Sequence, residues 1–141
     1  MTQELSYKAG DLLERAYNFA TDGGCEYFTP EHILYTILSD YSDALKDDVG
    51  INVGKIKQSL ILFISNMNKN IQLKEKPKAS RLLIKTFENA KKITNNEVSE
   101  RIKLTHIIRG MYLLENSFAS YLLHIDFSCS PAKYLTSSTI A

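Results

Sequence analysis

Two halves of this sequence carry the same spacing of apolar residues, and this repetition constrains the fold more than any other feature. One pair of matching segments, 70 positions apart, reads Leu12-Leu13-x-x-Ala16-Tyr17-x-x-Ala20 and Leu82-Leu83-x-x-Thr86-Phe87-x-x-Ala90. A second pair, 74 positions apart, reads Glu31-His32-Ile33-Leu34-x-x-Ile37-Leu38 and Thr105-His106-Ile107-Ile108-x-x-Met111-Tyr112. A short third pair, at an offset of 77, is Ala44-Leu45 and Tyr121-Leu122. Offsets that grow in small steps at loops are typical of a duplicated unit.

Within each half the apolar residues recur every three or four positions, which predicts helices. We expect eight of them: about 5–21, one beginning at 29, 42–48, 52–67, 79–93, 105–115, a short one near 118–122, and a last one from 130 to 135. The helix over 52–67 is expected to bury one face, formed by Val53, Ile56, Leu60, Phe63 and Met67. No stretch of useful length alternates with the period of a strand, so no sheet is expected.

A polar segment rich in Lys and Asn, which includes Pro77, divides the two halves and predicts a linker over residues 67–78. It separates repeat 1, residues 5–66, from repeat 2, residues 79–136. A unit of about 65 residues is marginally stable alone, so the two repeats should pack against each other. The expected fold is all-α, with tandem duplicated four-helix repeats packed as one pseudo-twofold domain within residues 1–141.

The composition excludes several classes of function. The 17 Lys and Arg residues nearly balance the 16 Asp and Glu residues, and a net charge of +1 disfavours a general nucleic-acid binder. Residues 1–70 carry a charge of −4 and residues 71–141 a charge of +5, which suggests a polarised surface. No apolar run is long enough to cross a membrane, and the first residues do not form a signal peptide. Cys25 and Cys129 are expected to be free thiols in a reducing cytoplasm.

No catalytic motif is present in the sequence. It lacks G-x-x-x-x-G-K-[ST], so it has no visible ATPase site, and it lacks G-x-S-x-G and H-E-x-x-H. Cys25 with His32 is a conceivable nucleophile and base, and Cys25, Glu31 and His32 form a conceivable metal site. A plain loop before a helix is the simpler interpretation of both, so we expect no catalytic residue, metal or cofactor in this chain.

The start of the second helix carries the residues that we single out for function. Thr29 is a good N-cap and Pro30 suits the first helical position. Glu26 and Glu31 bracket this cap, so they are predicted to form an exposed acidic edge, although Glu31 also complements the helix dipole. Tyr27 lies in the same loop and is a candidate interface anchor.

Three neighbours of this edge have competing interpretations. Phe28 is either a second interface anchor or a residue that fills the core. His32 and His106 occupy equivalent helix starts, and each either contacts a ligand or caps a nearby backbone group. Because both copies have the histidine, we favour capping.

The segment Thr29-Pro30-Glu31-His32-Ile33-Leu34 resembles the Thr-x-Glu-His-Leu/Ile-Leu motif of the Clp N-terminal repeat domain. The resemblance extends over residues 5–135. The second copy departs from the pattern, since Thr105 stands where well-preserved members repeat the Glu. The turn Cys25-Glu26-Tyr27-Phe28-Thr29 is most similar to the ClpA type, which has His-Glu-Phe-x-Thr there.

This resemblance implies an N-terminal protein-interaction module of a ClpA-type AAA+ unfoldase, a monomer when isolated. Its partners would be a ClpS-like adaptor and substrate proteins, with a ClpP-type peptidase acting through the full-length protein. ATP and Mg would bind only to ATPase modules that follow this domain in the full-length protein. The implied adaptor-binding and substrate-binding residues are Glu26, Tyr27, Phe28, Thr29 and Glu31.

Three other functions stay open on the sequence. Within the family, a ClpC-type domain would read phosphoarginine on its substrates, which requires an acidic residue in both repeats. A ClpB-type domain would hold aggregated chains. Outside the family, the helical content alone is compatible with a DNA-binding domain, although the negative charge of residues 1–70 argues against it.

Overall fold

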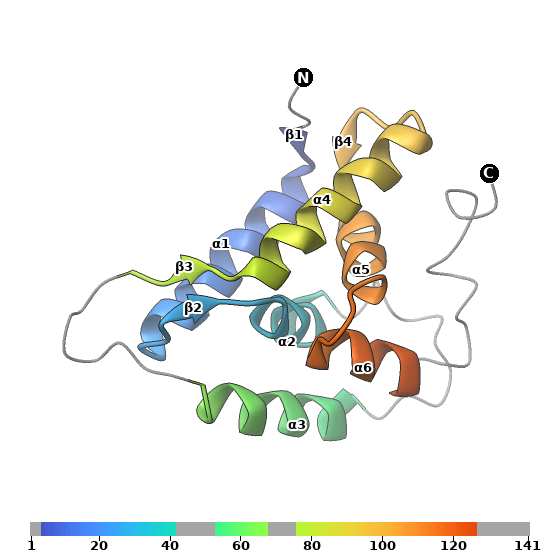
Figure 1. The fold of residues 1–141 in the computed structure, drawn as a ribbon. Coiled ribbons are helices and arrows are strands. Elements are labelled where there is room, and N and C mark those ends of the chain that lie inside the picture. Colours follow the sequence, from blue (N-terminus) through green and yellow to red (C-terminus); the bar gives the residue numbers. More distant parts are fainter. Residues whose placement is uncertain (1–3, 42–52, 68–75, 127–141) are drawn as a thin grey trace.

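The computed structural model describes residues 4–41, 53–67 and 76–126, and it is mostly helical (Figure 1). The described helices are α1 (Tyr7–Asp22), α2 (Pro30–Asp40), α3 (Val53–Ser65), α4 (Arg81–Asn96), α5 (Leu104–Tyr112) and α6 (Phe118–Asp126). The described residues thus contain six helices and not eight. The helices predicted over 42–48 and 130–135, and also Cys129, lie outside the described residues.

The two repeats correspond at one constant offset. Helices α1 and α4 are both 16 residues long, and their first residues, Tyr7 and Arg81, are 74 positions apart. The N-caps Ser6 and Ser80 show the same offset, and each serine side chain accepts a hydrogen bond from the backbone N–H three residues later. The predicted offset of 70 between these helices is therefore wrong by four residues. Leu13 corresponds to Phe87 and not to Leu83.

Four two-residue strands join the repeats, although no strand was expected. Strand β1 (Glu4–Leu5) pairs in parallel with β4 (Arg101–Ile102), and β2 (Tyr27–Phe28) pairs in parallel with β3 (Lys78–Ala79). The offset of 74 relates β1 to β3 and β2 to β4, so it exchanges one strand pair for the other. This exchange is what a twofold relation between the repeats requires. The last residue of the predicted linker, Lys78, belongs to β3.

The core lies between α1 and α2 of repeat 1 and α4 and α5 of repeat 2, which pack on one another pairwise. Helices α2 and α5 supply most of its largest fully buried apolar side chains: Ile33, Leu34, Ile37, Ile107, Ile108 and Met111. Helices α4 and α5 approach closely at Gly110, where an added Cβ would lie 2.5 Å from the carbonyl oxygen of Thr86. A glycine is therefore required at this crossing.

Several expected buried faces differ in detail. On α3 the buried residues are Ile56, Leu60 and Ile64, whereas Phe63 is 38% exposed. Helix α4 continues past its predicted end at Ile93 to Asn96. Among the described helices, none has both the length and the apolar character needed to cross a membrane.

Candidate functional site

A groove opens beside the predicted site, where the start of α2 meets the end of α3 and the start of α4. Its volume is about 480 Å³. We call it the Tyr27 groove, and its lining residues are Tyr27, Thr29, Pro30, Glu31, Phe63, Asn66, Met67, Ser80 and Leu82. Three of the five residues that the sequence singled out line this groove. Residues of both repeats form it.

Tyr27 is the exposed aromatic residue of this edge, with 45% of its surface accessible. The preceding chain turns at Gly24, whose φ of 66° favours glycine. The strand pair then fixes the backbone, because the N–H of Lys78 donates to the carbonyl of Glu26 at 3.1 Å. Tyr27 is therefore presented on an ordered strand and not on a free loop.

The charge at this edge is mixed. The side chain of Glu26 is half-buried, and the exposed Lys78 is the direct strand partner of Tyr27. The exposed Arg81 follows two residues after β3. The expectation of an acidic edge is therefore corrected: the edge also carries two exposed basic residues, Lys78 in β3 and Arg81 at the start of α4.

Phe28 and Thr29 serve the interior. Phe28 is 8% exposed, and its ring packs edge-on against Tyr17 with centroids 5.5 Å apart. The Thr29 backbone N–H donates to Nδ1 of His32 at 3.1 Å, and the Thr29 hydroxyl lies 2.9 Å from the same nitrogen. The structure thus favours a core role for Phe28 and a capping role for Thr29. Both roles fix the frame of the groove.

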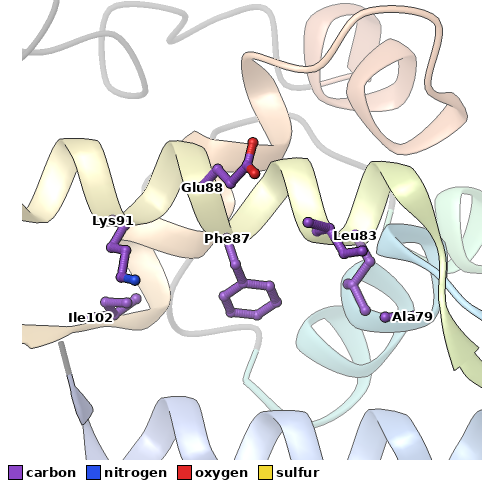
Figure 2. Close-up of a pocket in the computed structure, with 7 residues that line it drawn as sticks. Ala79, Leu83, Phe87, Glu88, Lys91 and Ile102 are labelled. Carbon is purple, nitrogen blue, oxygen red and sulfur yellow. The ribbon is translucent and has the colours of Figure 1, made fainter. Parts of the chain in front are cut away.

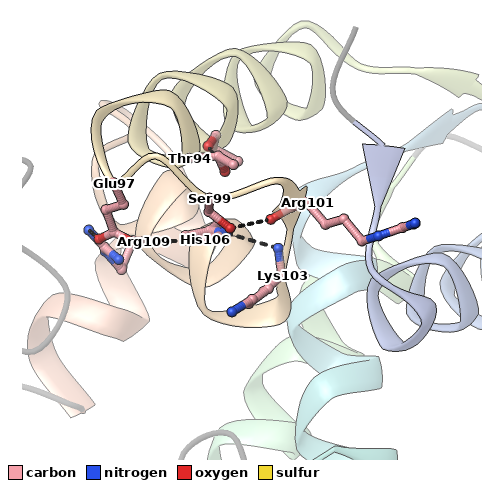
Figure 3. Close-up of polar contacts among 8 residues, drawn as sticks. Thr94, Glu97, Ser99, Arg101, Lys103, His106 and Arg109 are labelled. Atoms are coloured by element: carbon pink, nitrogen blue, oxygen red, sulfur yellow. Dashed lines mark hydrogen bonds and ion pairs between the residues drawn. The ribbon is translucent and has the colours of Figure 1, made fainter.

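The second copy uses its histidine in the same way, which confirms the capping interpretation. The backbone N–H of Lys103 donates to Nδ1 of His106 at 2.9 Å (Figure 3). Nε2 of the same ring lies 3.0 Å from Oε1 of Glu97, and Oε2 of Glu97 accepts from Arg109 Nη2 at 2.6 Å. The Arg109 guanidinium, with His106, holds the pKa of Glu97 below its ordinary value.

Glu31 is not a surface carboxylate, which corrects a central expectation. It is 3% exposed, and its Oε2 accepts a hydrogen bond from the backbone N–H of Ala119 at 2.8 Å. The Ser117 hydroxyl donates to the same oxygen at 3.4 Å. Burial raises the pKa of Glu31 above its ordinary value, and the N–H of Ala119 opposes this effect. Glu31 therefore links the start of α2 to the start of α6.

Sequence reasoning missed the contribution of α3 to the groove. The rings of Phe63 and Phe118 stack with centroids 4.6 Å apart, so α3 and α6 meet beside the groove. Phe63 and Met67 fit the apolar period of α3, and for that reason both were assigned to the core. The apolar period identifies which face of a helix turns inward, but it does not show at which residue along that face the packing of neighbouring elements ends.

A second apolar groove runs along α4, and sequence reasoning did not predict it (Figure 2). Its volume is about 320 Å³. We call it the α4 groove, and it is lined by Ala79, Leu83, Ile84, Phe87, Glu88, Lys91 and Ile102. In Figure 2, Leu83, Phe87 and Lys91 extend from the same side of the helix, Lys91 beside Ile102, whereas Glu88 points the other way.

The conceivable metal site finds no support in the geometry. Over residues 4–41, 53–67 and 76–126, no group of three or more His, Cys, Asp or Glu side chains gathers to hold an ion. Cys25 is buried, His32 caps α2, and Glu31 is bonded to α6. These three residues therefore serve packing and helix capping.

Comparison with known proteins places this fold. The N-terminal domain of Hsp104 from Candida albicans is similar, with a TM-score of 0.79 and 12% identity over 94% of this chain and 90% of that chain. The N-domain of ClpV from Vibrio cholerae has a TM-score of 0.71 and 19% identity over 94% and 83%. The N-terminal domain of the ClpV1 ATPase from E. coli has a TM-score of 0.70 and 19% identity over 96% and 85%.

At these identities the structural similarity establishes the fold alone. No curated protein matches the sequence. The family described as "Clp repeat (R) N-terminal domain" matches residues 4–125, which is most of the chain. The protein therefore belongs to the Clp repeat N-terminal domain family.

Proposed function

We propose that this chain is the docking module of a ClpA-type AAA+ unfoldase. In this role it binds a ClpS-like adaptor and substrate proteins and delivers the substrates to the ATPase ring of the full-length protein. A ClpP-type peptidase that associates with the full-length protein then degrades them. The chain itself contains no ATPase module. The family membership and the ClpA-like turn at residues 25–29 support this role, and the Tyr27 groove is the observation that carries it.

The physical properties of the Tyr27 groove suit a protein ligand. An exposed Tyr beside partly exposed apolar side chains, here Phe63 and Met67, is a common anchor of protein interfaces. The strand pair β2–β3 and the histidine cap of α2 hold the walls in place before binding. A preformed site loses little conformational entropy on binding, which favours affinity.

The mixed charge of the rim adds orientation. Glu26 suits a basic group of the adaptor, whereas Lys78 and Arg81 suit an acidic one. Exposed ion pairs contribute about 0.2–1 kcal/mol each to binding, so these charges are expected to affect the choice of partner more than the affinity. The apolar contact at Tyr27 is expected to supply most of the affinity.

A ClpB-type function is the second candidate, and the α4 groove favours it. An apolar floor at Leu83 and Phe87, with Ile84 52% exposed, suits apolar segments of unfolded chains (Figure 2). The ClpC-type function has less support, because the Glu31 carboxylate is bonded to α6 and Thr105 replaces its counterpart. A DNA-binding role has no positive observation in its favour.

A titration of the purified ClpS-like adaptor from the same organism tests the proposed function and shows which of the two grooves binds the adaptor. Tyr27→Ser alters the Tyr27 groove and Glu26→Lys the charge next to it, whereas Ile84→Ser alters the α4 groove by a matched exposed change. We expect the first two variants to weaken adaptor binding and Ile84→Ser to leave it unchanged. Loss of affinity in Ile84→Ser alone would move the docking site to the α4 groove.

A further inference from the structure

We propose that Glu31 is a positioning residue for the Tyr27 groove: it holds the start of α6 so that Phe118 supports the groove wall formed by Phe63. This inference rests on the proposed docking function. It gives repeat 2 a defined part in a site that the sequence located in repeat 1. It also gives Glu31 a function that does not require contact between its carboxylate and a partner.

The first step is the link between Glu31 and α6. The backbone N–H groups in the first turn of a helix have no partner within the helix. Here the N–H of Ala119 finds its acceptor in Oε2 of Glu31 at 2.8 Å, and the hydroxyl of Ser117 approaches the same oxygen at 3.4 Å. Glu31 therefore caps a helix that lies 88 positions further along the chain.

The second step leads from α6 to the groove. Phe118 lies between the two residues that Glu31 holds, and its ring stacks on that of Phe63 with an angle of 10° between the planes. Phe63 lines the Tyr27 groove, together with Met67 from the same end of α3. Phe118 and Phe63 thus connect the hydrogen bond between Glu31 and α6 to the part of the groove wall that α3 forms, while Glu31 itself also borders the groove.

The third step is that the hydrogen bond to the N–H of Ala119 needs a side chain at position 31 that is long enough to reach it and carries an acceptor oxygen. Glu31 lies in the first turn of α2, and its own backbone is fixed by the cap at Thr29. Its side chain spans the space to α6 and is 3% exposed, so a shortened side chain leaves the N–H of Ala119 without this acceptor. Glutamine has the same length and retains one acceptor oxygen.

Two measurements on the 141-residue chain test the inference. The first is the nuclear Overhauser effect between the rings of Phe63 and Phe118, and the second is the Kd of the purified ClpS-like adaptor. In Glu31→Ala we expect the ring contact to disappear and the Kd to rise. If only one Glu31→Ala molecule in ten keeps the Phe63 wall in its binding position, the affinity for the adaptor falls about tenfold, because only that fraction can bind. In Glu31→Gln we expect both readouts to stay close to those of the wild type.

Phe118→Ala provides the matched comparison, because it removes the support of the wall and leaves Glu31 in place. We expect its Kd to rise as in Glu31→Ala, and the double variant to be no weaker than either single one, since both act through one contact. If Glu31→Ala does not fold by circular dichroism, Glu31→Asp, which is one methylene shorter, takes its place.

A folded Glu31→Ala variant with the wild-type ring contact and the wild-type Kd would overturn the inference, as would additive losses in the double variant. Failure of the proposed function has a different signature. In that case the wild-type chain does not bind the adaptor, while the ring contact still responds to Glu31→Ala.

Discussion

Oε2 of Glu31 accepts a hydrogen bond from the backbone N–H of Ala119 at 2.8 Å, which ties the second helix of repeat 1 to α6 of repeat 2. The parallel strand pairs β1–β4 and β2–β3 also cross between the repeats. Each repeat is too small to bury a large core alone, so these crossings help to make one folding unit of the two. They also place the Tyr27 groove at the junction and not within one repeat.

Comparison of Glu31→Gln with the wild type predicts an unusual dependence on pH. Because burial raises the pKa of Glu31 in the folded state, the folded protein takes up its proton first as the pH falls. The wild type should therefore gain stability relative to Glu31→Gln as the pH falls through the raised pKa toward the ordinary value of 4.5. Urea unfolding of both proteins across this pH range measures the difference between their free energies of unfolding. A relative loss of wild-type stability there would contradict the prediction.

Glu97→Gln should show the opposite sign. The Arg109 guanidinium lowers the pKa of Glu97 in the folded state, so its contribution to stability is present above the ordinary value of 4.5. The wild type should lose stability relative to Glu97→Gln as the pH falls from that value through the lowered pKa. The same urea series tests this, and parallel curves for the two proteins would show that the ion pair has no net effect.

Gly110→Ala is expected to destabilise the fold, because the new Cβ would lie 2.5 Å from the carbonyl oxygen of Thr86. Overpacking of this kind costs about 1–3 kcal/mol of unfolding free energy. Gly10→Ala is the matched control, since nothing lies within 4 Å of its added Cβ in α1. In a helix interior it should add about 0.5–1 kcal/mol. Equal thermal shifts for the two variants would rule out a close crossing of α4 and α5.

The repeat was predictable from the sequence, but its exact register was not. An offset of 70 differs from the observed 74 by four residues, which is close to one helical turn. A shift of one turn keeps apolar residues on the same face, so the pattern of Leu12 and Leu13 fits either alignment. The caps Ser6 and Ser80 would have resolved the register, because a helix start is a single position.

The candidate site was predictable only in its local part. Thr29 and Pro30 identified the start of α2, because capping depends on neighbouring residues. The burial of Glu31 depends on Ala119, 88 positions away, and no local pattern indicates such a partner. The four strands were missed because two residues are too few to show alternation.

The central claim is that a ClpS-like adaptor docks at the Tyr27 groove, and backbone amide shifts of the isotope-labelled chain during an adaptor titration test it most directly. We predict that the largest shifts fall on residues that line the groove, Tyr27, Phe63 and Met67. Shifts gathered instead along the α4 groove, at Ile84, Phe87 and Ile102, would contradict the account.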